Sequence, residues 1–228
     1  FSFLSMLLPF FIWASGKSEN SKDDAPKSQI AQTIDGFRYV ANHPILPGLF
    51  LLDIGITTAS FYREILPVLA LGLFAGGASA TGMLGAANSV GAIVGSLLAL
   101  LLVGFRAKGM LVLYASFAYG LILFGFGTVN SLWLGILMIG LLGAADAVTV
   151  AVRMTTVMLT TPDNMRGRAF SLMFLAASTA NNIGTIWVGF WAASIGADNT
   201  MILGGFISIT ATALIFLLVK PIRAFRSN

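Results

Sequence analysis

Residues 132–159 read LWLGILMIGLLGAADAVTVAVRMTTVML, an apolar run that carries only two charged side chains, Asp146 and Arg153. A helix of this length is long enough to cross the roughly 30 Å hydrocarbon core of a bilayer. All of its backbone polar groups would be satisfied within the helix, as lipid requires. Similar runs lie on both sides of this one, so we expect the chain to cross a membrane several times.

The chain contains five further runs of this kind, separated by short loops. With 57% hydrophobic and 10% charged residues among 228, it has too few polar groups to cover a water-soluble globule. Its 25 glycines favour helices that pack closely through small residues. The predicted fold class is therefore an all-α membrane protein with a six-helix bundle. The predicted spans are residues 45–71, 81–103, 110–127, 132–159, 169–195 and 200–219.

The first 43 residues differ from this pattern. Phe1–Ala14 is apolar and resembles the end of another helix; the alternative is a cleaved signal peptide, although a basic segment before the run is missing. Residues 15–28 have the composition of an aqueous linker. Residues 29–42 predict an amphipathic helix, either on the membrane surface or as an ordinary solvated connector. Its apolar side would carry Ile30, Ile34, Phe37 and Ala41, opposite Gln32, Asp35 and Arg38.

The basic residues provide an internal check on this topology, because eleven of the 13 fall on one side of the predicted membrane. The opposite loops contain no Lys or Arg, and a count of five or seven spans would break this agreement. By the positive-inside rule, the linker and the carboxyl terminus face the cytoplasm. The eleven are Lys17, Lys22, Lys27, Arg38, Arg106, Lys108, Arg166, Arg168, Lys220, Arg223 and Arg226.

Several classes of function are disfavoured by composition. The chain has no cysteine and a single histidine, His43, which argues against a zinc site, a cysteine nucleophile or acyl-transfer chemistry. We therefore expect no enzyme, no metal and no cofactor. The net charge of +4 lies mainly in the loops, where it orients the protein against lipid, so no nucleic-acid partner is expected.

Asp146 and Arg153 are candidates for a role inside the membrane. A lone charge at mid-membrane costs at least about 2.5 to 3.5 kcal/mol, so such residues normally face a partner or an aqueous cavity. Arg153 follows Asp146 by seven residues, which is about two helical turns on nearly the same face. Two hypotheses stay open: Asp146 carries a proton or cation under the influence of Arg153, or the charges are a static pair between helices.

The first predicted span contains three more charges, Asp53, Arg63 and Glu64. Asp53 either marks a substrate path or bonds to a neighbouring helix end. Arg63 and Glu64 are adjacent and so point to different sides of their helix, near the outer interface. They are candidates for a gate ion pair or for plain snorkelling to the interface. Pro67 is expected to bend or end this span near the far face.

The fifth predicted span offers amide and indole groups suited to an amphipathic ligand. Asn181, Asn182 and Trp187 are therefore candidates for lining a substrate cavity, whereas Trp191 also fits an interfacial anchor.

Three stretches carry a resemblance to a known family. They are residues 36–44 (GFRYVANHP), residues 63–67 (REILP) and the turn at residues 161–168 (TPDNMRGR). Together with the span pattern, they are similar to the carboxyl-terminal half of a major facilitator superfamily transporter, in the drug and siderophore efflux branch. The turn at residues 104–109 matches the position of that family's gating loop, but its usual acidic residue is absent. Arg106, Lys108, Arg166 and Arg168 would then lie in cytoplasmic loops.

The resemblance implies a plan for the whole chain. Residues 1–14 would end helix six of twelve, 15–43 would form the cytoplasmic central loop, 44–219 the carboxyl-terminal bundle and 220–228 a cytoplasmic tail. The bundle would consist of two inverted three-helix repeats, with a cavity lined mainly by the first, second, fourth and fifth spans. An amino-terminal six-helix bundle would be the missing partner.

The resemblance also implies a function. We expect a proton-coupled permease of a bacterial inner membrane that exports a small amphipathic molecule, a drug or siderophore, by alternating access. Its partners would be that molecule, protons and the lipid bilayer. The alternatives are a lysophospholipid or sugar permease of the same superfamily, or a non-transporting membrane scaffold or receptor.

Overall fold

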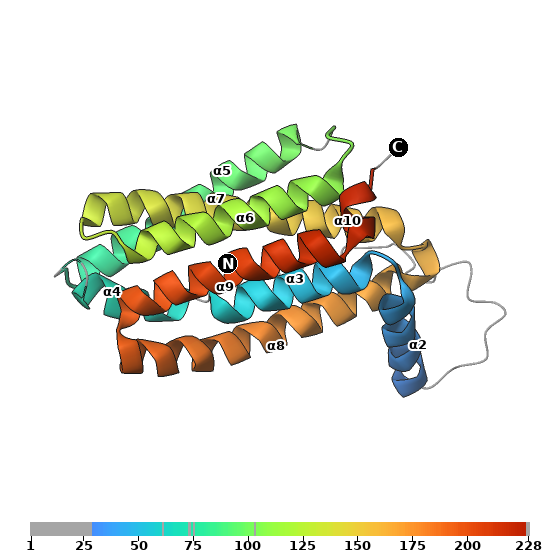
Figure 1. Ribbon diagram of the computed structural model, residues 1–228, viewed down its shortest axis with the longest axis horizontal. Coiled ribbons are helices and arrows are strands. Elements are labelled where there is room, and N and C mark those ends of the chain that lie inside the picture. The colour runs from blue at the N-terminus through green and yellow to red at the C-terminus, as the bar shows by residue number, and fades with distance from the viewer. Residues whose placement is uncertain (1–28, 61, 73, 75, 103, 227–228) are drawn as a thin grey trace, which may run out of the picture.

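The computed structural model describes residues 29–60, 62–72, 74, 76–102 and 104–226. Throughout these residues the regular secondary structure is helical, which confirms the predicted all-α fold. The expectations for residues 1–28 lie outside the described part. The elements, shown in Figure 1, are α2 (Gln29–Asn42), α3 (Leu46–Ala59), the 3₁₀ turn η2 (Tyr62–Ile65), α4 (Leu66–Gly72), α5 (Ala78–Leu101), α6 (Lys108–Gly127), α7 (Leu132–Thr160), α8 (Asp163–Ile195), α9 (Ala197–Leu218) and α10 (Lys220–Ala224).

In the described residues, five helical stretches are long and apolar enough to cross a membrane. They correspond to the first, second, third, fourth and sixth predicted spans. The fifth predicted span lies in α8, which has 33 residues but is less apolar because polar side chains recur along it. The helix is present where it was expected, and the count of six spans stays a prediction.

The first span is broken, and the break is not at Pro67 as predicted. α3 ends at Ala59, η2 follows, and α4 starts again at Leu66. Pro67 is the second residue of α4, a position near a helix start where a missing N–H costs little. The polar pair Tyr62–Arg63 therefore lies in a discontinuity of the helix, which is a common place for a binding site in transporters.

The helices pack in a pattern that agrees with two inverted repeats. α5 packs on α7 as α8 packs on α3, and α6 packs on α7 as α9 packs on α3, while α6 and α9 pack on each other. The packed pairs stay the same when the helices of one three-helix repeat are replaced by their counterparts in the other, that is, α3 by α7, α5 by α8 and α6 by α9. α3 and α7 are therefore equivalent elements, and they run along the bundle in Figure 1.

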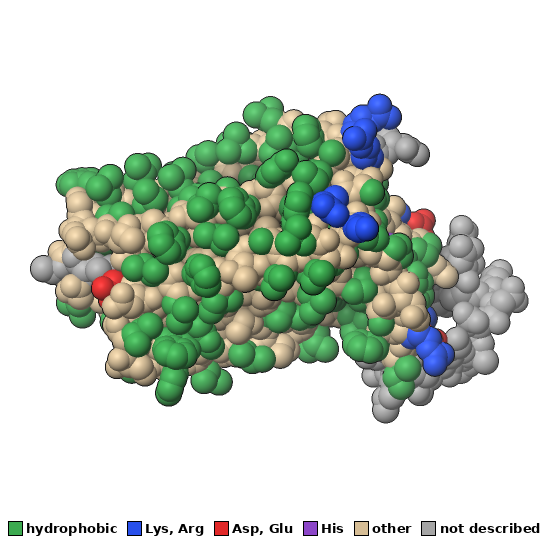
Figure 2. All heavy atoms as spheres, viewed as in Figure 1, with side chains coloured by type: hydrophobic (Ala, Val, Ile, Leu, Met, Phe, Trp, Pro, Cys, Tyr) green, Lys and Arg blue, Asp and Glu red, His purple; other side chains and the backbone are tan. Residues whose placement is uncertain are grey.

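One end of the bundle collects the basic side chains. Ile222 of α10 lies against Gly48 at the start of α3 and Gly109 at the start of α6, and Gly36 of α2 lies against Arg168 at the start of α8. Figure 2 shows Lys and Arg gathered at this end, with hydrophobic side chains along the length of the bundle. Residues 220–224, expected to be part of a tail, form a helix whose Ile222 is fully buried.

His43 caps the corner between α2 and α3. Its Nδ1 accepts hydrogen bonds from the backbone N–H groups of Ile45 (3.2 Å) and Leu46 (3.3 Å), which the first turn of α3 cannot satisfy itself. Burial lowers the pKa of His43, while a hydrogen bond to the Thr160 carbonyl acts in the opposite direction. The neutral imidazole keeps Nδ1 available as the acceptor that this corner needs.

Small residues bring α5 and α7 into backbone contact. A methyl group added at Gly91 would overlap the Gly140 carbonyl, and one at Gly95 would overlap the Ala144 carbonyl. The spacing of four residues on both helices is the pattern that allows close packing in membranes. This contact holds α7, and with it Asp146 and Arg153, at a fixed depth against α5.

We predict that Gly91→Ala and Gly95→Ala each destabilise the protein by about 1–3 kcal/mol, because the added methyl forces these helices apart. Gly85→Ala is the matched control on the same helix, since the described residues place nothing within 4 Å of its added methyl. We expect this control to be neutral or stabilising, by up to about 1 kcal/mol. Thermal unfolding of the full-length protein in detergent measures all three, and equal stability of Gly85→Ala and Gly95→Ala would contradict the packing.

Candidate functional site

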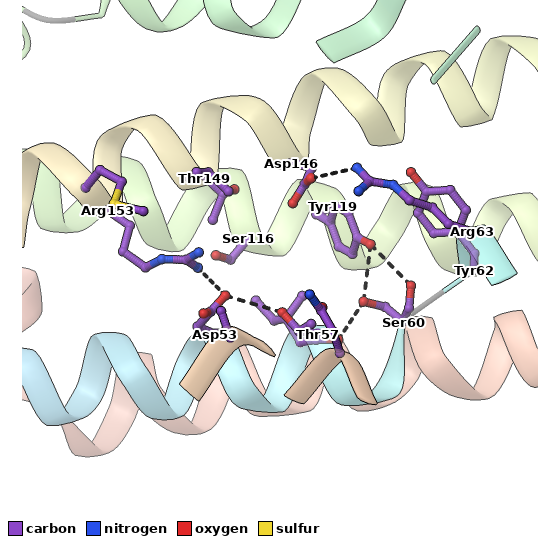
Figure 3. Close-up of a pocket in the computed structure, with 15 residues that line it drawn as sticks. Asp53, Thr57, Ser60, Tyr62, Arg63, Ser116, Tyr119, Asp146, Thr149 and Arg153 are labelled. Carbon is purple, nitrogen blue, oxygen red and sulfur yellow. Dashed lines mark hydrogen bonds and ion pairs between the residues drawn. The ribbon is translucent and has the colours of Figure 1, made fainter. Parts of the chain in front are cut away.

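A cavity of about 250 Å³ lies within the bundle, lined by α3, η2, α6, α7 and α8. Its polar residues come from elements far apart in the sequence, as Figure 3 shows. Its apolar lining comes from Ile56, Val150, Met154 and Ala177. The cavity therefore combines an apolar wall with a few polar groups, which is typical of small-molecule sites. The polar lining residues are Asp53, Thr57, Ser60, Tyr62, Arg63, Ser116, Tyr119, Asp146, Thr149, Arg153 and Asn181.

The deeper of two ion pairs in the cavity joins α3 to α7. The Nη1 of Arg153 donates to Oδ1 of Asp53, and the residues are only 7% and 6% exposed. The hydroxyl of Thr57 donates to the same carboxylate oxygen at 3.3 Å. Each charge compensates the other where little water can reach, so neither can be removed without stranding its partner.

The second ion pair lies toward the helix break and is open to the cavity. The Nη2 of Arg63 in η2 is 3.2 Å from Oδ2 of Asp146 on α7, and the two side chains are 49% and 43% exposed. Pairs with this much exposure contribute little to stability and separate readily. Because of this difference in exposure, we expect the Asp53–Arg153 ion pair to stay formed and the Arg63–Asp146 ion pair to break and form more readily.

A set of hydrogen bonds holds the break in place. The hydroxyl of Tyr119 on α6 reaches the Ser60 hydroxyl at 3.2 Å and its carbonyl at 3.4 Å, and the Ser60 hydroxyl donates to the Ile56 carbonyl at 2.5 Å. The amide of Asn88 on α5 donates to the Tyr62 hydroxyl. These bonds place the backbone directly before Arg63, so the position of Arg63 opposite Asp146 is set by three helices.

The structure separates the residues predicted for the site. Asp53, Arg63, Asp146, Arg153 and Asn181 line the cavity. Asp146 is paired with Arg63 and Arg153 with Asp53, so each charge on α7 reaches across to the first span. Both hypotheses for Asp146, a proton carrier or a member of a static pair between helices, stay open. Glu64 is exposed on η2 and is not among the lining residues. What each of these residues does stays a prediction.

The remaining candidates lie elsewhere. Asn182 is exposed on α8, and Trp187 is half-buried with its ring 6.3 Å from that of Trp191. At the basic end, Arg166 donates from Nε to the Met158 and Thr161 carbonyls, each at 3.1 Å, and so caps the end of α7. The other basic-loop candidates, Arg106, Lys108 and Arg168, also lie outside this cavity.

Two features of the cavity were not expected. The second span was predicted to line it, yet the third does so through Ser116 and Tyr119, because glycines hold α5 against α7 on the far side of that helix. Tyr62, Ser60 and Thr57 were missed as well. Thr57 follows Asp53 by one helical turn, and Tyr119 follows Ser116 by nearly one turn. Two polar residues at this spacing lie on the same face of an apolar helix, and this pattern could have identified them as cavity-lining residues.

Comparison of the sequence with known proteins identifies the family to which this chain belongs. The family model described as transmembrane secretion effector, within the major facilitator superfamily, matches residues 1–227. The chain belongs to this family. The family consists of transporters, so this chain is a multi-pass membrane protein of the transporter class, and the predicted resemblance is confirmed.

Several relatives of this family member are described as the enterobactin exporter EntS. That of Citrobacter koseri is 29% identical over 190 residues, which cover 83% of this chain and 45% of the relative. That of Salmonella typhi is 27% identical over 193 residues, covering 84% and 46%. That of Escherichia coli O81 is 29% identical over 193 residues, covering 85% and 46%. The chain thus spans about half the length of the curated relatives it matches.

We predict that the two ion pairs differ in their effect on stability. Asp53→Asn strands the buried guanidinium of Arg153 and should cost about 3–5 kcal/mol. Asp146→Asn, the same substitution in the half-exposed pair, should cost about 1 kcal/mol or less. A double-mutant cycle of Asp53→Asn with Arg153→Gln should recover much of the larger loss. Thermal unfolding of the full-length protein in detergent measures these changes, and equal losses from the two Asn variants would contradict the assignment.

Proposed function

We propose that this chain forms half of a transporter that exports a small amphipathic, siderophore-like molecule across a bacterial inner membrane in exchange for protons. Membership of the family and the relatives described as enterobactin exporters support the class of function. The observation that carries the mechanism is the half-exposed pair of Arg63 and Asp146, which links α7 to the break in the first span.

Asp146 is the proton-carrying group in this proposal. Its carboxylate lies in the cavity, where water or substrate can reach it, and its partner is a single guanidinium at 3.2 Å. Protonation removes the negative charge and with it the attraction to Arg63. Arg63 then loses its ion pair with α7, and its side chain is free to move within the cavity, while the hydrogen bonds from Tyr119 and Asn88 keep the backbone of the break in place. A substrate that donates a hydrogen bond to the ionised carboxylate of Asp146 would compete with the proton for that group, so proton and substrate would occupy the cavity in turn.

The proposed transport cycle uses alternating access, and the internal repeat that relates α3 to α7 supports it as a feature common in transporters of this kind. Rocking of one bundle against the other changes access around a fixed central site. The buried Asp53–Arg153 pair would keep α3 and α7 together during this motion, while the Arg63–Asp146 pair breaks and forms. The second bundle is the partner that we expect in the complete transporter, with residues 15–43 as the linker and residues 44–219 as the present bundle.

We also propose the orientation in the membrane. The end that carries α2, α10 and the starts of α3, α6 and α8 would face the cytoplasm, because the basic side chains outside the spans gather there. The break between α3 and α4 then lies toward the outer side.

The test uses the complete protein in everted membrane vesicles, with enterobactin as the trial substrate. Asp146→Asn should reduce uptake driven by a proton gradient at least tenfold, because the carboxylate can no longer gain and lose a proton. Exchange of labelled for unlabelled substrate needs no net proton movement and should persist. Asp163→Asn is the matched control, since Asp163 is 86% exposed at the start of α8 and forms its ion pair with the nearby Arg166, outside the cavity.

Two results would overturn this proposal. Unchanged driven uptake by Asp146→Asn would show that another group couples the proton. Absence of gradient-dependent uptake in the unmodified protein, for enterobactin and for a panel of amphipathic drugs, would favour a membrane scaffold or receptor in which the charges are structural pairs.

A further inference from the structure

Two polar atoms in the cavity have no hydrogen-bond partner among the described residues, although both are buried. They are Oγ of Ser116 on α6 and Nε of Arg153 on α7. Ser116 is fully buried and Arg153 is 7% exposed. Both residues line the cavity described above, and their side chains project into it in Figure 3. Two buried donors on residues that line the same cavity are therefore unused by the described part of the protein.

The orientation of Ser116 is unusual for this chain. Buried hydroxyls on the other helices donate to the carbonyl four residues earlier, as those of Thr149, Thr156, Ser208 and Thr212 do at 2.8 Å. Such a bond satisfies a hydroxyl in an apolar surrounding without any external group. The hydroxyl of Ser116 makes no such bond, and a buried polar group left without a partner destabilises the folded protein. A group that enters the cavity would recover that loss of stability.

The charges of the cavity restrict what this group can be. Asp53 and Asp146 are balanced by Arg153 and Arg63, so the four charged lining residues sum to zero. The Nη1 of Arg153 is already occupied by Asp53. A second carboxylate on the same guanidinium would lie close to that of Asp53 and would be repelled. An uncharged acceptor oxygen meets no such repulsion and still accepts from Nε–H and from the hydroxyl.

We infer that Ser116 and Arg153 form a subsite for an uncharged acceptor oxygen of the substrate, such as the carbonyl of an ester or amide. The neighbouring Ile56, Val150 and Met154 provide an apolar wall for the rest of the molecule. The subsite lies beside the fixed ion pair, so it holds the substrate while the Arg63–Asp146 pair changes state. This inference rests on the proposed transport function and names the substrate chemistry that the cavity selects.

The experiment measures equilibrium binding, so it is independent of proton-driven flux. The probes are benzamide, which carries a neutral carbonyl, and benzoate, its anionic counterpart, observed by saturation-transfer NMR on the full-length protein in detergent. Benzamide should bind more tightly than benzoate, and Ser116→Ala should weaken benzamide binding roughly fivefold to tenfold. The stability of Ser116→Ala should equal or exceed that of the unmodified protein, because the substitution removes an unsatisfied buried group.

Ser208→Ala is the matched control, since Ser208 is equally buried but is bonded to the Gly204 carbonyl on α9, away from the cavity. It should leave benzamide binding unchanged. Tighter binding of benzoate, or equal benzamide binding by Ser116→Ala and the unmodified protein, would overturn the subsite. Loss of driven transport by Asp146→Asn together with unchanged benzamide binding in that variant would support the coupling role and the subsite separately.

Discussion

The buried ion pair between Asp53 and Arg153 is the constraint on which the rest of the structure depends. A charge placed this deep in a bundle is tolerated only next to its partner, so α3 and α7 must face each other across the cavity at one register. The contact of α5 with α7 through glycines then fixes the second helix of the repeat. This ion pair and this helix contact determine the position of the cavity, its charge balance and the position of the helix break next to it.

The two ion pairs differ in exposure. The buried pair at one end of the cavity should stay formed, whereas the half-exposed pair at the other end can break. Arg153 is held by Asp53 among buried side chains, whereas Arg63 meets Asp146 in a part of the cavity that solvent reaches. The break after Ala59 is needed for this arrangement, because a continuous helix would carry Arg63 along a different path. Hydrogen bonds from Tyr119 and Asn88 hold the break without charge, so protonation in the cavity leaves them intact.

Much of this fold could be predicted from the sequence. The apolar runs gave the helices to within a few residues, since lipid forces the backbone into helices. The pairing of charges could not be predicted, because Asp146 and Arg153 share a face and their partners lie 83 and 100 residues away in sequence. The break was assigned to Pro67 because proline is the usual cause, whereas here hydrogen bonds from other helices stabilise it. α8 was read as a span by length, although its polar residues make it less apolar than the rest.

The most direct test of the account is the proton movement that accompanies substrate movement. The complete protein would be reconstituted into liposomes that contain a pH-sensitive dye, and an imposed enterobactin gradient would supply the only driving force. The account predicts proton movement opposite to that of the substrate in the unmodified protein, and substrate exchange without proton movement in Asp146→Asn. Proton movement that persists in Asp146→Asn would contradict the central claim that the Arg63–Asp146 pair is the coupling element.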